Sequence, residues 1–356
     1  MIFAKYFYKF VQLLFFYDKI RIMKNYSLFL EGAMKLFINR NLGTERMKEL
    51  EDMGYDIIYA PERDFRNLKR EDVEAWDNID EIYSADVWFT YMGFDQFDIT
   101  KMKNLKYVHL TSAGINQVPV EHLIKKDIIL SNNTTGYAIP MAESVVMYIL
   151  EVYKNSRKMF KYQDSKTWRT DMSWIELSGK RVGFLGTGNI AQEAAKRLRA
   201  FDVVLWGVNT NGRSIDGFDR CFSIDNCDEF FRECDVIVGI MPATESTTGL
   251  IDEEKMLLMK EGSTLINIGR GNLINEDDLE KNISKFRGVV LDVVEEEPLS
   301  TESKLWEFEN VIITPHNCWV SENNIERLAD RVIENMKSFI ETGKPKTYLK
   351  DIKRGY

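Results

Sequence analysis

Three segments of the sequence place a reactive side chain directly after, or at the end of, a short run of apolar, β-branched residues. Arg270 lies between two glycines after one run, Asp292 ends a second run, and His316 follows a third. A guanidinium can hold a carboxylate through two parallel hydrogen bonds, and a histidine beside a carboxylate can donate a proton near neutral pH. These residue types therefore indicate a site that binds a small acid and transfers a proton to it.

Histidine chemistry can be narrowed to one residue because the chain contains only three histidines. His109 lies within an apolar run, which is typical of a hydrogen-bonded core histidine, and His122 lies in a segment, 120–125, that we interpret as an exposed helix face. His316 remains as the candidate proton donor. So few histidines also leave little material for a histidine-built metal site, and no metal is expected.

The sequence offers several acidic partners for the histidine. Three consecutive glutamates at 295–297 precede Pro298, and their spacing leaves open which of them is special. Arg270 could also be a surface turn residue, and Asp292 could cap the turn that follows it. The glycines on both sides of Arg270 favour a closely packed backbone, because glycine allows an approach that a side chain would block. We therefore expect Arg270 to belong to the site.

A glycine turn between a predicted strand and a predicted helix is the most informative motif. The segment Gly186-Thr-Gly188-Asn-Ile-Ala191 follows a strand at 181–185 and precedes a helix at 192–201. Gly186 permits the tight turn, Gly188 lets the backbone approach a pyrophosphate, and Ala191 allows close packing of helix on strand. This context predicts dinucleotide binding. A purely structural turn and an S-adenosylmethionine site, which uses similar glycines, are the alternatives.

The end of the next predicted strand bears on the choice of dinucleotide. An acidic residue there would bind the ribose 2′-hydroxyl of NAD, whereas a nearby arginine would accept the 2′-phosphate of NADP. Asn209 stands where the acid would be expected, and Arg213 follows closely. The pattern favours NADP over NAD, unless Arg213 is only a solvated loop residue.

The scaffold that must position these residues is an alternation of apolar strands and amphipathic helices from residue 34 onward. In the first part we expect strands at 35–39, 56–59, 87–90, 107–110 and 128–131, and helices at 45–53 and 139–153. In the second part we expect six strands, as in a full dinucleotide-binding sheet, at 181–185, 203–208, 236–240, 263–268, 289–292 and 311–313. This rhythm predicts an α/β fold with two doubly wound, parallel-sheet domains.

The carboxyl ends of the second set of strands should meet at one crevice. Ligands of open α/β sheets bind there, so we expect the glycine turn, Arg270, Asp292 and His316 to converge. A last amphipathic helix is predicted at 321–342. Its apolar face comprises Ile325, Leu328, Val332, Met336 and Phe339.

The composition is that of a folded globular protein and excludes several classes. The chain has 356 residues, a length that suggests two domains, and 47 Lys and Arg against 56 Asp and Glu give a formal charge of −9. This acidic balance argues against a nucleic-acid partner. The four cysteines form no CxxC pair, which favours a cytoplasmic location.

Residues 1–33 differ from the rest of the chain, since they are rich in Phe and Tyr and carry more basic than acidic residues. The apolar stretch is interrupted by lysines and is shorter than the roughly 20 residues that a bilayer span needs. No small-residue cleavage site follows it, so a secretory signal is not expected. We expect an extension outside the fold and no membrane partner; a peripheral helix lying on a membrane is the alternative.

Four motifs in order carry a resemblance to a known family: Gly-Thr-Gly-Asn-Ile-Ala at the glycine turn, Ile-Asn-Ile-Gly-Arg-Gly around Arg270, Leu-Asp-Val-Val-Glu-Glu-Glu-Pro after Val290, and Thr-Pro-His at His316. Supporting segments are 111–118, Ala142-Glu143 and 241–244. From about Met34 to Thr342 the chain resembles the D-isomer-specific 2-hydroxyacid dehydrogenases.

The resemblance implies a role for each site residue. Arg270 would clamp the substrate carboxylate, His316 would be the acid/base, Glu297 its charge partner, and Asp292 would orient the nicotinamide. The backbone of Ser112, Ala113 and Gly114 would help to hold the carboxylate. The residues expected to contact NAD or NADP are Gly186, Gly188, Asn189, Ile190, Asn209, Arg213, Met241, Pro242, Ile268, Arg270, Asp292 and His316.

The resemblance also implies the organisation of the protein. It predicts a Rossmann dinucleotide-binding domain at 136–317 and a discontinuous, flavodoxin-like substrate domain at 34–135 and 318–356. Members are usually dimers, and the short segment after 342 leads us to expect no regulatory domain there.

A small 2-oxo acid or D-2-hydroxy acid, such as glyoxylate, hydroxypyruvate or pyruvate, is the expected substrate. The segment 90–94, which should face the substrate, lacks the basic residue that a phosphate would require. A nucleotide-sensing binding protein of the same fold, with little turnover, is the alternative to an enzyme. Retention of Arg270, Glu297 and His316 together argues against it.

Overall fold

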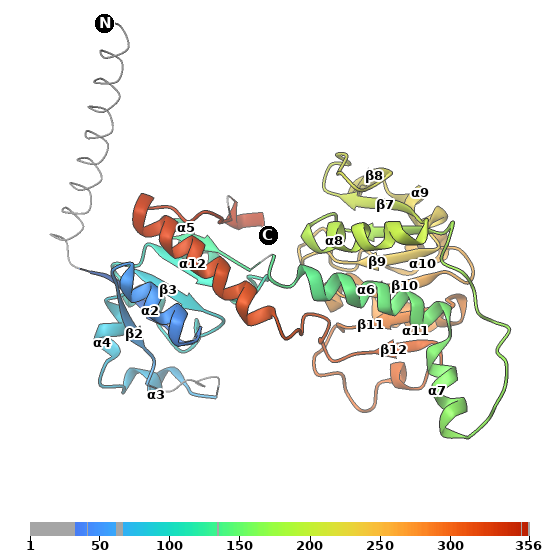
Figure 1. Ribbon diagram of the computed structural model, residues 1–356, viewed down its shortest axis with the longest axis horizontal. Coiled ribbons are helices and arrows are strands. Elements are labelled where there is room, and N and C mark those ends of the chain that lie inside the picture. Colours follow the sequence, from blue (N-terminus) through green and yellow to red (C-terminus); the bar gives the residue numbers. More distant parts are fainter. Residues whose placement is uncertain (1–32, 41, 62–66, 134, 350, 355–356) are drawn as a thin grey trace, which may run out of the picture. The chain divides into compact units, whose positions relative to one another are not determined.

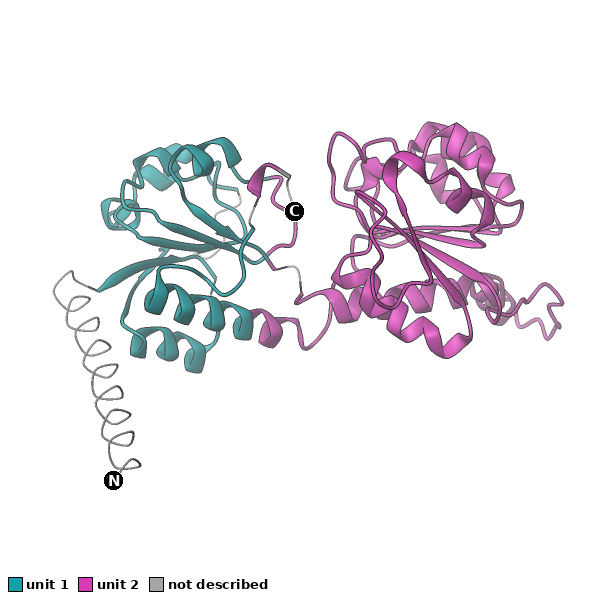
Figure 2. Cartoon of the chain, turned by 90° about the horizontal axis from the view of Figure 1, so that it is seen from above, with its two compact units in different colours: residues 1–111, 117–132, 329–350 teal, residues 112–116, 133–328, 351–356 magenta. Residues whose placement is uncertain are grey.

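The structure is a computed structural model that describes residues 33–40, 42–61, 67–133, 135–349 and 351–354. The extension predicted at 1–33 lies outside the described residues, apart from its last residue. The chain divides into two compact units (Figure 2). Unit 1 comprises the described residues up to Thr111, together with 117–132 and 329–350, and unit 2 comprises 112–116, 133–328 and 351–356.

Unit 1 is built on a sheet of five strands in the order β2-β1-β3-β4-β5, and every neighbouring pair is parallel. The strands are β1 (Met34–Ile38), β2 (Tyr55–Tyr59), β3 (Val87–Thr90), β4 (Tyr107–Leu110) and β5 (Ile129–Ser131). This order is that of flavodoxin-like sheets. All residues of β3 and β4 are buried, as expected of central strands in a sheet that is covered on both faces.

The helices of unit 1 surround this sheet (Figure 1). They are α2 (Thr44–Asp52), α3 (Arg70–Glu74), α4 (Ile79–Tyr83), α5 (Val120–Lys125) and the larger part of α12 (Asn324–Thr342). Of the predicted apolar face of α12, Leu328, Val332, Met336 and Phe339 are buried. The prediction was wrong for Ile325, which is 56% exposed because the helix begins only at Asn324 and its first turn extends beyond the core.

His109 in β4 is the core histidine that the sequence indicates. It is fully buried, its Nδ1 lies 3.1 Å from the carbonyl oxygen of Leu110, and its Nε2 lies 3.1 Å from Nδ2 of Asn335 in α12. A carbonyl can only accept, so Nδ1 donates and Nε2 accepts from the amide. Burial lowers the pKa of His109 to about 4. His122 in α5 is half-buried, not fully exposed as predicted.

Unit 2 contains a sheet of seven parallel strands in the order β12-β11-β10-β9-β6-β7-β8. The strands are β6 (Arg181–Leu185), β7 (Val204–Asn209), β8 (Arg220–Ser223), β9 (Val236–Gly239), β10 (Thr264–Asn267), β11 (Gly288–Leu291) and β12 (Val311–Ile313). Chain order reverses between β6 and β9, as in the Rossmann arrangement. The predicted count of six omitted β8, a short edge strand in which only Phe222 is buried.

The helices of unit 2 are α6 (Ala138–Tyr153), α7 (Ser156–Asp164), α8 (Asn189–Leu198), α9 (Asp228–Glu233), α10 (Glu253–Leu258) and α11 (Glu276–Asn282). Most of them lie on the two faces of the sheet, whereas α7 projects beyond it and buries none of its residues (Figure 1). Ala191 and Ala194 of α8 are buried in one core cluster with Val145 and Ile149 of α6. The small alanine side chains let α8 pack closely against α6 and against the sheet, directly after the glycine turn.

Both sheets confirm the predicted fold class of two parallel-sheet α/β domains. The domain boundaries predicted from the sequence do not coincide with the division between the units and stay a prediction. Among the described residues, no helix combines the length and apolar character required to cross a bilayer.

Candidate active site

The carboxyl ends of three neighbouring strands carry three of the predicted site residues. Strands β10, β11 and β12 lie side by side and run parallel (Figure 1). Arg270, Asp292 and His316 each follow one of these strands within a few residues. Because parallel strands end at the same edge of the sheet, the fold of unit 2 brings these residues to one edge, as the sequence predicts.

His316 is paired with Glu297. The histidine Nδ1 lies 2.8 Å from Oε2 of the glutamate, and the side chains of the histidine and the glutamate are 44% and 39% exposed. A carboxylate accepts, so Nδ1 donates and the ring keeps Nε2 for another partner. Among the described residues, Nε2 makes no hydrogen bond or ion pair. The histidine can therefore offer one nitrogen to a ligand while the other is held in place.

The structure distinguishes among the three consecutive glutamates. Glu295 is exposed, and its backbone N–H donates to Oε1 of Glu276 in α11 at 2.7 Å. Glu296 is exposed as well. Only Glu297 reaches His316, and its Oε1 also lies 3.4 Å from the backbone nitrogen of Val294.

Asp292 anchors the turn that carries His316. Its carboxylate is 1% exposed, and Oδ1 accepts from the hydroxyl of Thr314 at 2.6 Å and from the backbone N–H of Asn317 at 2.8 Å. The backbone N–H of Cys318 lies within 3.2 Å of both carboxylate oxygens. The backbone oxygen of Asp292 accepts from the N–H of His316 at 2.8 Å. In this structure the carboxylate is directed at the turn after β12.

The hydroxyl of Thr314 has a second contact that the sequence does not indicate. It lies 2.9 Å from the phenolic oxygen of Tyr148 in α6. Neither residue is among the predicted site residues. The segment 139–153 also contains Tyr153, so nothing in the sequence singles out Tyr148.

Arg270 follows β10, has an extended backbone conformation and is half-buried. Its Nη1 donates to the carbonyl of Gly269 at 2.7 Å, and no carboxylate of the described residues forms an ion pair with it. Gly114 lies against the same guanidinium, since a side chain at this glycine would collide with Nη2 of Arg270. The hydroxyl of Ser112 donates to the carbonyl of Gly114 at 2.8 Å, which stabilises this loop. The arginine is therefore placed to accept an external carboxylate.

The glycine turn has the geometry that a dinucleotide requires. Gly186 adopts φ +102°, and a Cβ there would lie 2.9 Å from the carbonyl oxygen of Ile240. Only glycine fits this position without strain. Gly188 precedes α8, and a Cβ built on it would meet nothing within 4 Å. Open space thus lies beside the amino end of a ten-residue helix, where backbone N–H groups and the helix dipole favour an anion.

Asn209 at the end of β7 is buried and engaged with its own loop. Its Oδ1 accepts from the backbone N–H of Arg213 at 3.1 Å, and its Nδ2 donates to the carbonyl of Arg213 at 2.9 Å. The amide therefore shapes the loop after β7. The guanidinium of Arg213 is exposed and forms no hydrogen bond or ion pair within the described part of the chain.

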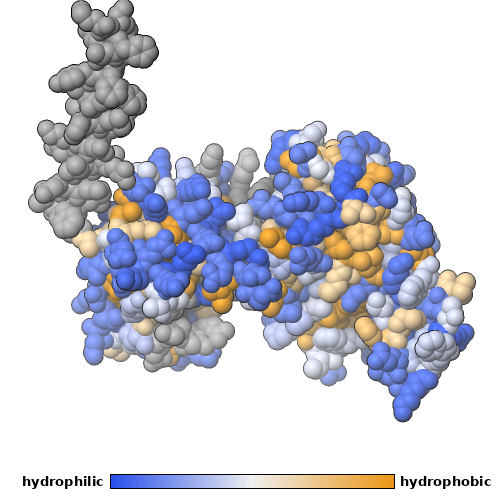
Figure 3. Space-filling model, viewed as in Figure 1, coloured by the Kyte–Doolittle hydropathy of each residue, from blue (hydrophilic) through white to orange (hydrophobic). Residues whose placement is uncertain are grey.

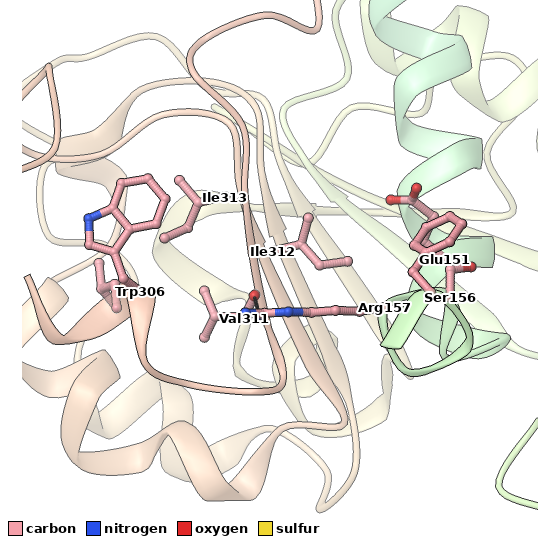
Figure 4. A pocket seen from close by; sticks show the side chains of 9 residues that line it. Glu151, Ser156, Arg157, Trp306, Val311, Ile312 and Ile313 are labelled. Carbon is pink, nitrogen blue, oxygen red and sulfur yellow. Dashed lines mark hydrogen bonds between the residues drawn. The ribbon is translucent and has the colours of Figure 1, made fainter. Parts of the chain in front are cut away.

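A cavity of about 260 Å³ lies elsewhere in unit 2, beside β12 and α7 (Figure 4). The residues that line it are Glu151, Ser156, Arg157, Phe160, Leu305, Trp306, Val311, Ile312 and Ile313. None of them is a predicted site residue, so the site is defined by its strand ends and its hydrogen bonds. No cluster of side chains suited to a metal ion occurs within the described ranges.

The fold and these contacts define unit 2 as a dinucleotide-binding α/β domain with an Arg/Glu/His set at its strand ends. Residues 146–318 match the family model described as D-isomer specific 2-hydroxyacid dehydrogenase, NAD binding domain. A Corynebacterium melassecola protein described as an uncharacterized protein in the proB 3′ region is 30% identical over 286 residues, covering 79% of this chain and 93% of that protein.

Two further comparisons agree. A hydroxypyruvate reductase of Blautia hydrogenotrophica is 28% identical, covering 85% of this chain and 94% of its own. The crystal structure of a D-isomer specific 2-hydroxyacid dehydrogenase family protein from Aeromonas salmonicida matches with a TM-score of 0.74 at 27% identity, covering 89% of this chain and 99% of that one. The chain belongs to the D-isomer-specific 2-hydroxyacid dehydrogenase family and is an NAD(P)-dependent oxidoreductase.

Proposed function

We propose that this enzyme reduces a small 2-oxo acid to the D-2-hydroxy acid, or catalyses the reverse oxidation, with His316 as acid/base and Arg270 as the carboxylate-binding residue. The observation that carries the proposal is the 2.8 Å contact between His316 and Glu297. The same sheet edge presents Arg270, which has no acidic partner among the described residues. A related protein of 28% identity is named hydroxypyruvate reductase, which supports a substrate of this class.

Arg270 supplies the binding of the acid. A bidentate guanidinium–carboxylate contact fixes the substrate carboxylate, and the adjacent cation stabilises negative charge on the neighbouring oxygen as it develops. The backbone of Ser112, Ala113 and Gly114 would complete this binding, since Gly114 already lies against the guanidinium. Stabilisation of charge that appears only in the transition state is what accelerates the reaction.

His316 supplies the proton. In the reduction, the protonated ring donates from Nε2 to the developing alkoxide, while Nδ1 stays hydrogen-bonded to Glu297. The carboxylate stabilises the positive ring and holds its orientation. In the oxidation the same nitrogen accepts the proton from the hydroxyl group.

The dinucleotide would be held by the glycine turn and its neighbours. Gly186 and Gly188 leave room for the pyrophosphate at the amino end of α8. The remaining residues proposed to line this site are Asn189, Ile190, Met241, Pro242, Ile268 and Asp292. When bound, the reduced nicotinamide supplies the hydride that is added to the 2-oxo carbon.

NADP is the proposed preferred form of the cofactor. No acid ends β7, and the amide of Asn209 is occupied by the backbone of its own loop. The exposed guanidinium of Arg213 provides a positive group that suits a 2′-phosphate.

Glyoxylate, hydroxypyruvate and pyruvate are the proposed substrates, because the segment 90–94 lacks a basic residue that would favour a phosphorylated acid.

We assign the substrate-binding domain to 34–135 and 318–356 and the dinucleotide-binding domain to 136–317. All four cysteines are free thiols, which supports the proposed cytoplasmic location. The acidic composition supports the absence of a nucleic-acid partner, and no membrane partner is proposed.

A homodimer formed through unit 2 is part of the proposal. Figure 3 shows apolar side chains gathered on the face of unit 2 where Figure 1 places α6 and α8. Ile139 and Met147 of α6 are among the exposed apolar residues of this unit. Helix α7 buries none of its residues, and Trp168 and Met172 in the segment after it are almost fully exposed. Exposed apolar surface of this kind marks an interface, and a second copy of the chain is the proposed occupant.

The test is oxidation of NADPH and NADH by the purified protein across a panel of 2-oxo acids. Arg270→Ala and His316→Ala should nearly abolish turnover while fluorescence titration shows cofactor binding largely intact. Arg232→Ala and His122→Ala serve as matched controls elsewhere on the surface and should behave as the wild type. Absence of oxidation with every acid would favour a nucleotide-sensing role, and wild-type turnover in either site variant would refute the assigned roles.

A further inference from the structure

A series of hydrogen-bonded hydroxyl groups connects helix α6 to the turn that carries His316. The phenolic oxygen of Tyr148 lies 2.9 Å from Oγ1 of Thr314, and this hydroxyl donates to Oδ1 of Asp292 at 2.6 Å. Since Thr314 has one proton and directs it to the carboxylate, Tyr148 must be the donor in the first contact. The hydrogen bonds therefore have a defined direction, from the phenol of Tyr148 through the hydroxyl of Thr314 to the carboxylate of Asp292.

The carboxylate at the end of this chain determines the conformation of the turn. The backbone N–H groups of Asn317 and Cys318 both point to the carboxylate of Asp292, and that of His316 points to its carbonyl oxygen. His316 itself adopts φ +51°, a left-handed conformation that costs a residue other than glycine free energy. Such a conformation persists only where neighbouring contacts over-determine it, and here those contacts converge on Asp292.

Tyr148, the first donor in this series of hydrogen bonds, is held in place by burial. It is 2% exposed, and its neighbours on the same helix, Val145 and Ile149, are fully buried against the sheet. Burial holds the pKa of Tyr148 well above its ordinary value, so the phenol keeps its proton and remains a donor. A phenylalanine would pack in the same place, which means that packing alone gives no reason for the hydroxyl.

We propose that Tyr148 is a positioning residue for His316, acting through Thr314 and Asp292 to hold the turn in the conformation that presents the imidazole. The inference rests on the proposed function of His316, but its structural part concerns only the orientation of the ring. Removal of the phenolic hydroxyl leaves Oγ1 of Thr314 without its donor and lets this side chain rotate, so the carboxylate holds the turn less firmly.

The kinetic test compares Tyr148→Phe with Tyr153→Phe. Tyr153 lies on the same helix, is also 2% exposed, and has no hydrogen bond from its phenol to the turn after β12. Tyr148→Phe should lower kcat about three- to tenfold, the factor that corresponds to one hydrogen bond, with KM for the cofactor unchanged. Tyr153→Phe should leave kcat at the wild-type value.

A double-variant cycle and proton NMR separate positioning from general stability. Thr314→Val should lower kcat by at least as much, and the double variant with Tyr148→Phe should be no slower than Thr314→Val alone, because both changes break the same chain. With only three histidines, the ring signals can be assigned from single variants. The signal of His316 should shift or broaden in Tyr148→Phe, while those of His109 and His122 should not.

Each outcome has a definite meaning. Wild-type kcat together with an unchanged His316 signal in Tyr148→Phe overturns the inference, as do equal losses of kcat in Tyr148→Phe and Tyr153→Phe or additive losses in the double variant. The NMR experiment needs no substrate. If no 2-oxo acid is reduced, the proposed function fails while the ring signal of His316 still decides whether Tyr148 positions it.

Discussion

Replacement of Glu297 by glutamine is the most informative single perturbation of the site. The amide keeps the size of the side chain and an oxygen that can accept from Nδ1 of His316, now 2.8 Å away, but it removes the negative charge. A hydrogen bond to a charged group contributes about 1.5–3 kcal/mol and a neutral one about 0.5–1.5 kcal/mol. The difference is roughly 1–1.5 kcal/mol, and partial exposure of both side chains places the effect toward the lower end.

This difference corresponds to a loss of about five- to twelvefold in the rate of reduction. The assay is steady-state oxidation of NADPH at saturating 2-oxo acid, with kcat and KM determined separately. The loss should fall on kcat, because the charge stabilises the imidazolium that donates the proton. Glu296→Gln, one residue away and exposed, is the matched control and should retain wild-type kcat. Equal rates for Glu297→Gln and the wild type, or equal losses in the two variants, would refute the assignment.

Burial lowers the pKa of His109 from 6.5 to about 4. Its contribution to the free energy of unfolding is therefore complete above pH 6.5 and is lost as the pH falls toward 4, a change of roughly 3 kcal/mol. Denaturant unfolding of the wild type and of His109→Gln should show this difference in pH dependence, and parallel curves would contradict it. Arg213→Ala should raise KM for NADPH at least about tenfold and leave KM for NADH unchanged. The control Arg199→Ala should change neither KM. Equal increases in KM for both cofactors would argue against a contact of Arg213 with the 2′-phosphate. Met147→Lys on α6 should convert the dimer to a monomer, as measured by light scattering. Leu257→Lys on α10 also replaces an exposed apolar residue by lysine and should leave the dimer intact. A monomeric wild type would exclude the dimer.

Much of the fold follows from the apolar pattern of the chain. The strands 87–90, 107–110, 181–185 and 311–313 have the predicted bounds. Central strands of a parallel sheet are buried on both faces and form continuous apolar runs, which a sequence displays directly. Strand β8 was missed because an edge strand needs no such run, and Ile325 was placed wrongly because the start of α12 depends on tertiary contacts.

The candidate site was predictable to the extent that it depends on strand ends. The placement of Arg270, Asp292 and His316 at one edge follows from the order of strands. The choice of Glu297 over its two neighbours could not be made from spacing, because it depends on how the chain turns after Val294. The contact of Tyr148 with Thr314 joins residues 166 positions apart, and no local pattern reports such a contact.

The central claim, that the enzyme transfers hydride and a proton to a 2-oxo acid with D stereochemistry, is tested most directly by chiral analysis of the product. Hydroxypyruvate or pyruvate is reduced with NADPH, and the hydroxy acid is resolved on a chiral column alongside the same reaction with His316→Ala. We predict the D-isomer from the wild type and almost none from the variant. Formation of the L-isomer, a racemic product, or equal yields from the two proteins would contradict the account.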